Sequence, residues 1–322
     1  MKKINIALLG YGTIGKGVFE ICSNNEYLNI VKILEKEEKF DKQIIELFTN
    51  DVNNIVNDNN IDLVVEVLGG YEFAKNCIVK CLNSGKHVVT ANKEIIAKDI
   101  EYLVNLAKDN NCHIAYEASV GGGIPIIKNL KELKKINKIT KITGILNGTT
   151  NFILTKMFEG MSFDEALKLA QKLGFAEADP TADLEGYDMM RKIAILSDLA
   201  WDTFIDINNV LHRGITSIKD EDIQNAKNNN QTIKFVCESI KEDNHISISV
   251  KPVVLENGHF LQTVNNEFNA VILETYPNDT LTFIGKGAGS LPTASAVVLD
   301  IIDIIEGNYL IEYQNKNKFD IN

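Results

Sequence analysis

The sequence contains few of the residues that are typical of secreted, disulfide-stabilised or membrane-spanning proteins. Its 322 residues include five cysteines, five prolines and one tryptophan. The cysteines are scattered and not at metal-ligand spacing, so we expect buried, reduced thiols rather than disulfides or a metal site. No apolar run reaches the ~18 residues that are needed to cross a membrane. We therefore expect a cytoplasmic protein that does not bind a membrane.

The chain also lacks an excess of positive charge. It has 33 lysine and arginine residues against 44 aspartate and glutamate residues, which gives a formal net charge of −11. Nucleic-acid binding requires clustered lysine and arginine, so we expect no nucleic-acid partner. The net charge does not exclude a small-molecule site, because such a site depends on the local charge rather than on the total charge of the chain. The length suggests about two domains.

The first part of the chain alternates between short apolar segments and amphipathic segments. The alternation predicts a parallel sheet with helices on both faces. Strands are expected over residues 4–9, 28–34, 61–67, 87–90 and 113–117, and helices over 13–22, over 72–84 and up to about 107.

The pattern changes after the glycine-rich residues 121–125. The mixture of elements that follows predicts a second domain of the α+β class. It comprises a helix to about 135, a strand over 138–146, mostly helices from 162 to about 241, strands over 246–255 and within 268–283, and a last helix over 293–305.

A Gly-x-Gly-x-x-Gly loop joins the first expected strand to the first expected helix. Gly10 permits the tight turn, Gly12 lets a pyrophosphate approach the backbone, and Gly15 lets the helix pack on the strand. The N–H groups at the helix start, where Thr13 and Ile14 lie, face the phosphates. The loop therefore predicts dinucleotide binding and a Rossmann-like domain.

The cofactor preference depends on a charged segment after the second strand. Glu35 lies about 20 residues after the last glycine, where an acidic residue binds the ribose hydroxyls of NAD. Lys36 and Lys39 are adjacent and can pair with the 2′-phosphate of NADP. A solvated run of charges without a ligand is a third interpretation, so NAD and NADP both remain open.

An acidic segment in the second half carries candidate chemistry. Residues 177–188 contain five carboxylates, and Asp188 and Lys192 are spaced i, i+4 on an expected helix. Such a pair alone is typical of an exposed helix surface. Several carboxylates beside a lysine, however, can hold an ammonium group and keep a catalytic lysine protonated.

Residues 174–192 resemble the signature of the homoserine dehydrogenase family. The similar residues are Gly-Phe-Ala-Glu-Ala-Asp-Pro-Thr from position 174, followed by Asp183, Gly186, Asp188 and Lys192. The glycine loop and the segments 89–93, 116–125, 144–151 and 285–296 agree in the same order. The resemblance spans residues 4–305.

The resemblance implies the reversible, NAD(P)-dependent interconversion of L-homoserine and L-aspartate 4-semialdehyde, in threonine and methionine biosynthesis. It implies that Lys192 is the acid/base and that Lys93 polarises the carbonyl beside the nicotinamide. Asp188 is expected to orient Lys192. The remaining expected contacts are Glu177 and Asp183 with the substrate, and Thr90, Lys93 and Gly287 with the cofactor.

The resemblance has further consequences for ions and assembly. Glu117, with the carbonyls of Val120, Gly122 and Ile124, resembles a monovalent cation site, expected to hold sodium; a glycine-rich hinge around a buried Glu117 is the alternative. The last helix is expected to return to the cofactor domain. The domains are then 1–130 with 287–322 for the dinucleotide, and 131–286 for catalysis and dimerisation as a homodimer. A C-terminal ACT domain is not expected.

Overall fold

The computed structural model describes residues 3–309 and 319–321, which form two compact units. The first unit runs to Pro125 and resumes at Ala288. The second unit spans Ile126–Gly287 and includes the terminal strand β13 (Asp320–Ile321). The sequence placed these boundaries at 130/131 and 286/287, and it grouped β13 with the first unit. None of the described helices has the length and apolarity of a membrane span.

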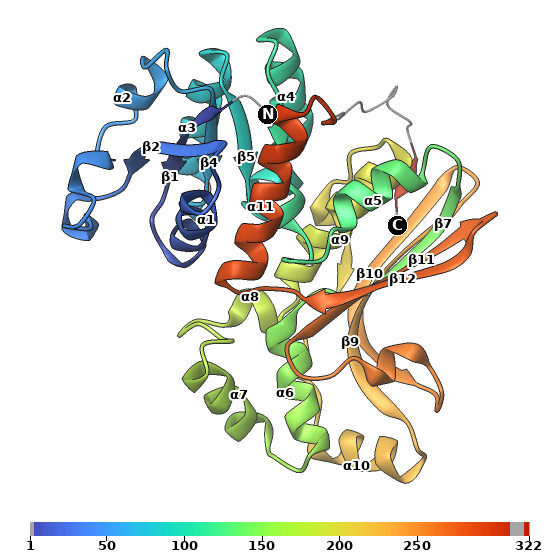
Figure 1. Cartoon of the computed structure of the whole chain (residues 1–322). Coiled ribbons are helices and arrows are strands. Elements are labelled where there is room, and N and C mark those ends of the chain that lie inside the picture. Colours follow the sequence, from blue (N-terminus) through green and yellow to red (C-terminus); the bar gives the residue numbers. More distant parts are fainter. Residues whose placement is uncertain (1–2, 310–318, 322) are drawn as a thin grey trace. The chain divides into compact units, whose positions relative to one another are not determined.

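A six-stranded parallel sheet forms the centre of the first unit (Figure 1). Its strand order is β3-β2-β1-β4-β5-β6, which is the Rossmann order, so the predicted fold class is confirmed. Apolar side chains such as Leu8 and Val65 are fully buried in it. The strands are β1 (Ile4–Leu9), β2 (Leu28–Leu34), β3 (Phe48–Thr49), β4 (Leu63–Glu66), β5 (His87–Thr90) and β6 (Ile114–Ala115).

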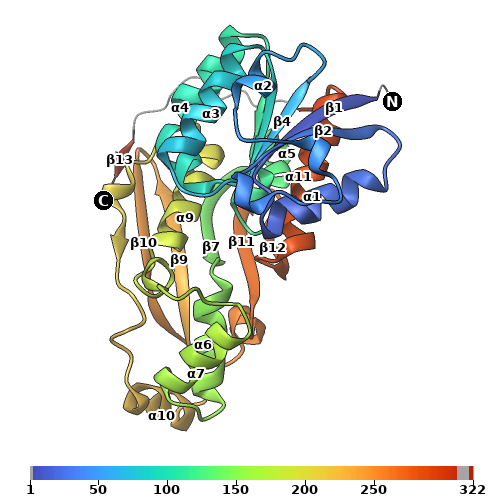
Figure 2. The ribbon, with the colours of Figure 1, turned by 90° about the vertical axis from the view of Figure 1, so that its left-hand side faces the viewer.

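Helices cover both faces of this sheet (Figures 1 and 2). α1 (Thr13–Ser23) packs against α11 (Ser290–Ile305), and α3 (Glu72–Asn83) packs against α4 (Lys93–Asp109). Gly17 permits the first contact, since a Cβ there would lie 2.8 Å from Ser290 Oγ. The short elements of this unit are α2 (Asn53–Val56), η1 (Glu37–Lys39), η2 (Ile45–Leu47) and η3 (Glu117–Ser119).

The second unit contains a mostly antiparallel sheet. Its order is β12-β11-β7-β9-β10-β13, and β8 also pairs with β10. The strands from β12 to β10 are antiparallel, whereas β8 and β13 run parallel to β10. The bounds are β7 (Lys138–Ile145), β8 (Leu211–His212), β9 (Thr232–Glu242), β10 (His245–Leu255), β11 (Phe268–Tyr276) and β12 (Asp279–Lys286).

Helix α9 (Tyr187–Trp201) lies against one face of this sheet. Ser197 Oγ donates to Ser239 Oγ at 2.8 Å, and Trp201 Nε1 donates to the Ile139 carbonyl at 2.9 Å. These contacts hold α9 on the sheet and thereby fix the position of the acidic segment at the start of the helix. The other elements are α5 (Ile126–Leu133), α6 (Gly148–Phe158), α7 (Phe163–Lys172), α8 (Thr181–Leu184), α10 (Asp220–Asn228), η4 (Ile207–Asn209) and η5 (Phe260–Thr263).

One expectation about the second unit is wrong. Helices were expected to dominate up to about residue 241, but residues 232–242 form strand β9. Its β-branched residues, such as Ile233 and Val236, favour a strand. Moreover, β9 pairs with β7 on one side and with β10 on the other, which satisfies its backbone hydrogen bonds. Charged residues within β9 hide this pattern in the sequence.

Candidate active site

The glycine loop directly follows β1, which pairs with β4 at the point where the strand order of the first sheet reverses. A Cβ on Gly10 would lie 2.7 Å from the Val67 carbonyl oxygen, and a Cβ on Gly15 would lie 2.2 Å from the Gly10 oxygen. Both glycines are therefore required by close backbone packing. A Cβ on Gly12 meets no atom within 4 Å. Gly12 thus borders open space, where the family's pyrophosphate would approach the backbone.

The start of α1 is suited to a phosphate. Gly12 is the N-cap residue, and no side chain caps the helix. The backbone N–H groups of the first turn, which includes Thr13, Ile14 and Gly15, have no partner within the helix. Together with the helix dipole they form an anion site. The residues present therefore fit a dinucleotide.

Glu35 contacts the glycine loop. Its carboxylate accepts hydrogen bonds from the backbone N–H of Tyr11 and of Lys36, both at 3.0 Å. Lys39 Nζ lies 3.8 Å from the same carboxylate, and the side chain of Lys36 is exposed. The charged segment therefore borders the glycine loop.

Thr90 lies at the carboxyl end of β5 and contacts a residue that the sequence analysis missed. Its Oγ1 donates to Glu66 Oε2 at 2.5 Å, and it accepts from the Asn92 N–H at 3.0 Å. Burial raises the pKa of the Glu66 carboxyl. A glutamate at the end of the apolar strand Leu63–Glu66 was the available signal for it. Lys93 is the first residue of α4, directly after the N-cap Asn92, and is half-buried.

A tight bend follows Glu117, which is itself buried. Gly121 and Gly122 have φ values of 74° and 56°, which favour glycine. The Glu117 backbone N–H donates to Asp300 Oδ2 at 2.7 Å, which ties the bend to α11. In the described part of the chain, no group of three or more His, Cys, Asp or Glu side chains is placed to hold a metal ion. A cation here would depend on backbone carbonyls, such as those of Val120, Gly122 and Ile124.

Lys192 and Asp188 form a buried ion pair on α9. Lys192 Nζ lies 2.7 Å from Asp188 Oδ2, and the two side chains are 9% and 5% exposed. Lys192 also donates to the Leu146 carbonyl at 2.7 Å, just after the end of β7. The lysine is therefore a charged donor with a fixed direction, inside the second unit.

Asn147 joins Asp183 to this pair, and the sequence analysis did not select it. Asn147 Nδ2 donates to Asp183 Oδ1 at 2.7 Å and to Asp188 Oδ2 at 2.9 Å. The same residue is the N-cap of α6. In the sequence, Asn147 lies within the segment 144–151 that resembles the family, where nothing marks its side chain as a partner of the acidic residues.

Two predicted residues are not part of this cluster. Glu177 is exposed, and its backbone carbonyl accepts from Gln171 Nε2 at 3.2 Å. Gly287 packs on Asn269, because a Cβ on Gly287 would lie 1.9 Å from Asn269 Nδ2. This internal contact requires a glycine at position 287, whatever its relation to the cofactor.

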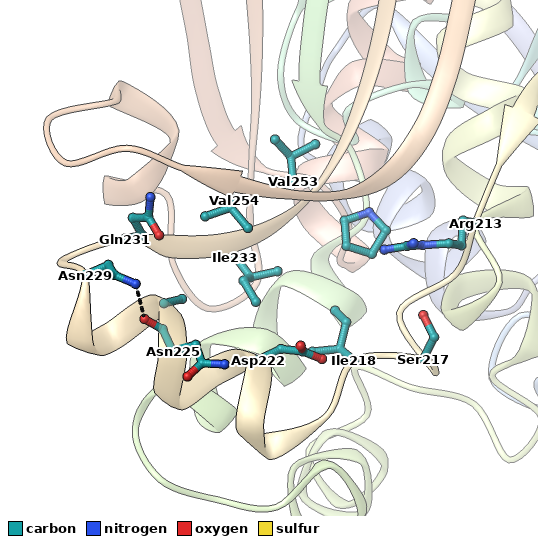
Figure 3. A pocket seen from close by; sticks show the side chains of 12 residues that line it. Arg213, Ser217, Ile218, Asp222, Asn225, Asn229, Gln231, Ile233, Val253 and Val254 are labelled. Atoms are coloured by element: carbon teal, nitrogen blue, oxygen red, sulfur yellow. Dashed lines mark hydrogen bonds between the residues drawn. The ribbon is translucent and has the colours of Figure 1, made fainter.

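A separate hollow of about 280 Å³ lies on the second unit between α10, β9 and β10. Figure 3 shows Arg213 at one end, Asp222 and Asn225 along α10, and Ile233 and Val254 on the strands. None of the residues predicted to act in the site lines it. We therefore assign no step of the reaction to this hollow.

The glycine loop at the switch point of a Rossmann sheet, with a buried lysine–carboxylate pair in a second unit, defines a dinucleotide-dependent oxidoreductase. The family profile described as "Homoserine dehydrogenase, NAD binding domain" matches residues 10–117, and the profile "Homoserine dehydrogenase" matches residues 125–302. The chain belongs to the homoserine dehydrogenase family, and its reaction is the NAD(P)-dependent interconversion of L-homoserine and L-aspartate 4-semialdehyde in threonine and methionine biosynthesis.

Individual relatives agree with this assignment. A homoserine dehydrogenase of Bacillus subtilis is 43% identical over 319 residues, which cover 95% of this chain and 74% of the relative. A crystal structure of a homoserine dehydrogenase from Thiobacillus denitrificans superposes with a TM-score of 0.94 at 34% identity, over 100% of this chain and 80% of that one. The structure of a hyperthermophilic archaeal homoserine dehydrogenase in complex with NADPH superposes with a TM-score of 0.83 at 29% identity. The superposition covers 97% of this chain and 100% of that one.

Proposed function

We propose that Lys192 exchanges the proton in this reaction and that Asp188 orients it. The observation that carries the proposal is the buried ion pair, whose Nζ–Oδ2 distance is 2.7 Å, with the Leu146 carbonyl as a second fixed acceptor. Two acceptors leave one N–H of the ammonium for a substrate oxygen. A general acid must be aimed in this way before its proton can be transferred.

The bound nicotinamide supplies or accepts the hydride at the substrate carbon. During reduction of the semialdehyde, Lys192 donates a proton to the carbonyl oxygen, which becomes the hydroxyl of homoserine. During oxidation, the neutral amine of Lys192 takes up the hydroxyl proton. Lys93 polarises the same oxygen as negative charge develops. Asp183 and the exposed Glu177 bind the substrate, Glu177 through the ammonium group of the amino acid.

The cofactor is NAD or NADP, held by the glycine loop with Thr90, Lys93 and Gly287. Glu35 is fixed beside the loop by the Tyr11 N–H, which favours a ribose diol as ligand. The exposed Lys36 and the neighbouring Lys39 favour a 2′-phosphate. NADPH in the archaeal structure supports the second alternative for that protein. A direct comparison of both cofactors decides between them.

The buried Glu117 and the carbonyls of Val120, Gly122 and Ile124 are proposed to hold sodium. One carboxylate with several carbonyl oxygens suits a hard monovalent cation. The ion would stabilise the bend that Gly121 and Gly122 form.

The chain is also proposed to act as a cytoplasmic homodimer. The sheet face that carries Val236 and Ile272 is hollowed by about 470 Å³ and is lined by apolar and charged residues. Lys141 crosses it, 2.7 Å from Glu238 and 3.8 Å from Glu274. A second copy covering this face would bury its partly exposed apolar residues, Val253, Phe260 and Ile272. All five cysteines are free and buried, which suits a reducing compartment.

The proposal is tested by following the absorbance band of the reduced cofactors NADH and NADPH. The purified chain is incubated with L-homoserine and either oxidised cofactor, and reduction of the cofactor is expected with at least one of them. L-serine, which is one methylene shorter, serves as the matched control substrate. Absence of turnover with both cofactors would overturn the proposed function.

A further inference from the structure

The structure assigns a positioning role to Asn147, whose side-chain amide bridges Asp183 and Asp188. Both N–H groups of the amide are used, at 2.7 Å to Asp183 Oδ1 and 2.9 Å to Asp188 Oδ2. Asn147 and Asp188 are both buried. We propose that this bridge keeps the two carboxylates separate and charged, so that one binds the substrate and the other holds Lys192. The inference rests on the proposed function.

The orientation of the Asn147 amide is fixed by Thr150. Asn147 Oδ1 accepts from the Thr150 backbone N–H and from Thr150 Oγ1, both at 2.9 Å. A backbone N–H can only donate, so the oxygen of the amide must face Thr150 and the nitrogen must face the carboxylates. Thr150 is fully buried, and the amide has no room to exchange these partners with water.

The donor character of the amide has a chemical consequence. Asp188 Oδ2 accepts from Asn147 Nδ2 and from Lys192 Nζ, so this oxygen carries no proton. Two carboxylates in direct contact would instead share a proton, which removes one negative charge. An amide between them donates a hydrogen bond to each carboxylate and does not take up a proton itself. Asn147 therefore preserves two charges within one small volume.

The other groups around Asn147 do not supply this function. Cys237 on β9 lies near the ion pair and donates to the Gly144 carbonyl, and burial raises its pKa to about 12. It is thus a neutral thiol at physiological pH. Lys234 on β9 reaches α6 one turn further along, where its Nζ donates to Asn151 Oδ1 at 3.2 Å. Asp183, Asp188 and Lys192 are the charged groups that the Asn147 bridge joins.

Two substitutions separate the bridge from the helix cap. Asparagine, aspartate and serine are all good N-cap residues, so Asn147→Asp and Asn147→Ser both keep the cap of α6. Asn147→Ser removes the bridge without adding charge. Asn147→Asp keeps the shape but places a third carboxylate against Asp183 and Asp188. This carboxylate becomes a donor only when it is protonated.

We measure kcat/KM for L-homoserine between pH 6 and pH 9, together with the Kd for the reduced cofactor. Asn147→Ser is expected to lower kcat/KM by about tenfold or more at every pH, as loss of a hydrogen bond to a charged group should. At pH 8, Asn147→Asp is expected to lower kcat/KM more than Asn147→Ser does. As the pH falls to 6, the kcat/KM of Asn147→Asp should rise at least about threefold relative to that of Asn147→Ser. Both variants should bind the cofactor with unchanged Kd.

Three results would overturn the inference. The first is an activity of Asn147→Ser within twofold of the wild-type value. The second is a pH dependence of kcat/KM for Asn147→Asp that equals that of Asn147→Ser. The third is that the variants lose cofactor binding together with activity. The first two would leave the proposed function intact, because the wild-type enzyme would still turn over. Absence of wild-type turnover would overturn the proposed function itself and the inference with it.

Discussion

Two helices of the molecule carry a carboxylate–lysine pair at the same spacing. On α4, Lys98 Nζ lies 2.7 Å from Glu94 Oε1, and on α9, Lys192 Nζ lies 2.7 Å from Asp188 Oδ2. Both pairs are spaced i, i+4. The side chains of the α4 pair are 37% and 28% exposed, whereas those of the α9 pair are 9% and 5% exposed. Equal spacing and equal distance therefore do not mean an equal environment.

The difference comes from what surrounds each pair. Lys98 Nζ also lies 4.5 Å from the centre of the Tyr71 ring, and the lysine side chain is partly exposed to solvent. Exposed pairs of this kind contribute little to stability. Lys192 instead donates to the Leu146 carbonyl, and Asp188 accepts from Asn147. Third partners and burial fix the positions of the α9 pair, which we propose acts on the substrate.

Replacement of each lysine by alanine should give the largest contrast in activity. Lys192→Ala removes the proposed proton donor, so kcat should fall by roughly 10²–10⁴-fold. Lys98→Ala removes an exposed side chain, so kcat should stay within about twofold of the wild-type value. Steady-state kinetics and cofactor binding are measured on both. Near-normal activity of Lys192→Ala would remove it from the proposed mechanism.

Removal of each carboxylate should produce a smaller contrast, in stability. Asp188→Ala leaves a buried ammonium without its carboxylate, which should cost about 3–5 kcal/mol of the free energy of unfolding. Glu94→Ala breaks an exposed pair in the first turn of α4 and should cost about 0.3–1 kcal/mol. Urea unfolding provides the measurement. Equal losses would contradict the assigned difference between the two environments.

Lys234 extends the comparison to a buried lysine whose acceptors are uncharged. Its Nζ donates to the Val264 carbonyl at 2.5 Å and to Asn265 Oδ1 at 2.9 Å. Burial lowers the pKa of Lys234 from 10.5 to about 8. Between these values the unfolded chain binds more protons than the folded one. The lysine's contribution to the free energy of unfolding should therefore rise with pH, by about 2–3 kcal/mol between pH 8 and pH 10.5.

The matched variant for this third prediction is Lys234→Gln, which keeps two donors but cannot titrate. The measured quantity is the difference in unfolding free energy between wild type and variant, at pH 7.5, 8.5 and 9.5. Below pH 8 both states hold the proton, so the difference should be constant there. A difference that stays flat up to pH 9.5 would show that Lys234 keeps its ordinary pKa.

The sequence predicted most of the first unit because its signals are local. The strands 28–34 and 87–90 have the expected bounds, and the glycine loop lies between a strand and a helix. The spacing of Asp188 and Lys192 likewise predicted their contact. These features depend on residues within one or two turns of each other.

The features that the sequence did not predict depend on distant residues. Strand β9 is stabilised by β7, which lies about 90 residues earlier in the chain. The bridge from Asn147 joins it to Asp188, 41 residues away. Pairing partners at such separations leave no periodic trace in the sequence. A polar residue that becomes buried, such as Asn147 or Lys234, looks like any residue of a loop or an exposed strand.

The two residues that directly follow β7 contact both members of the buried ion pair of α9. The Leu146 carbonyl accepts from Lys192, and the Asn147 side chain donates to Asp188. Both residues directly follow β7, so a shift of β7 by one residue would move both groups by about 3.3 Å relative to the ion pair. The chain therefore has regions of unequal tolerance to insertion. One extra residue in β7 would misalign the pair, whereas one in the turn at Asp243 between β9 and β10 would lengthen a loop.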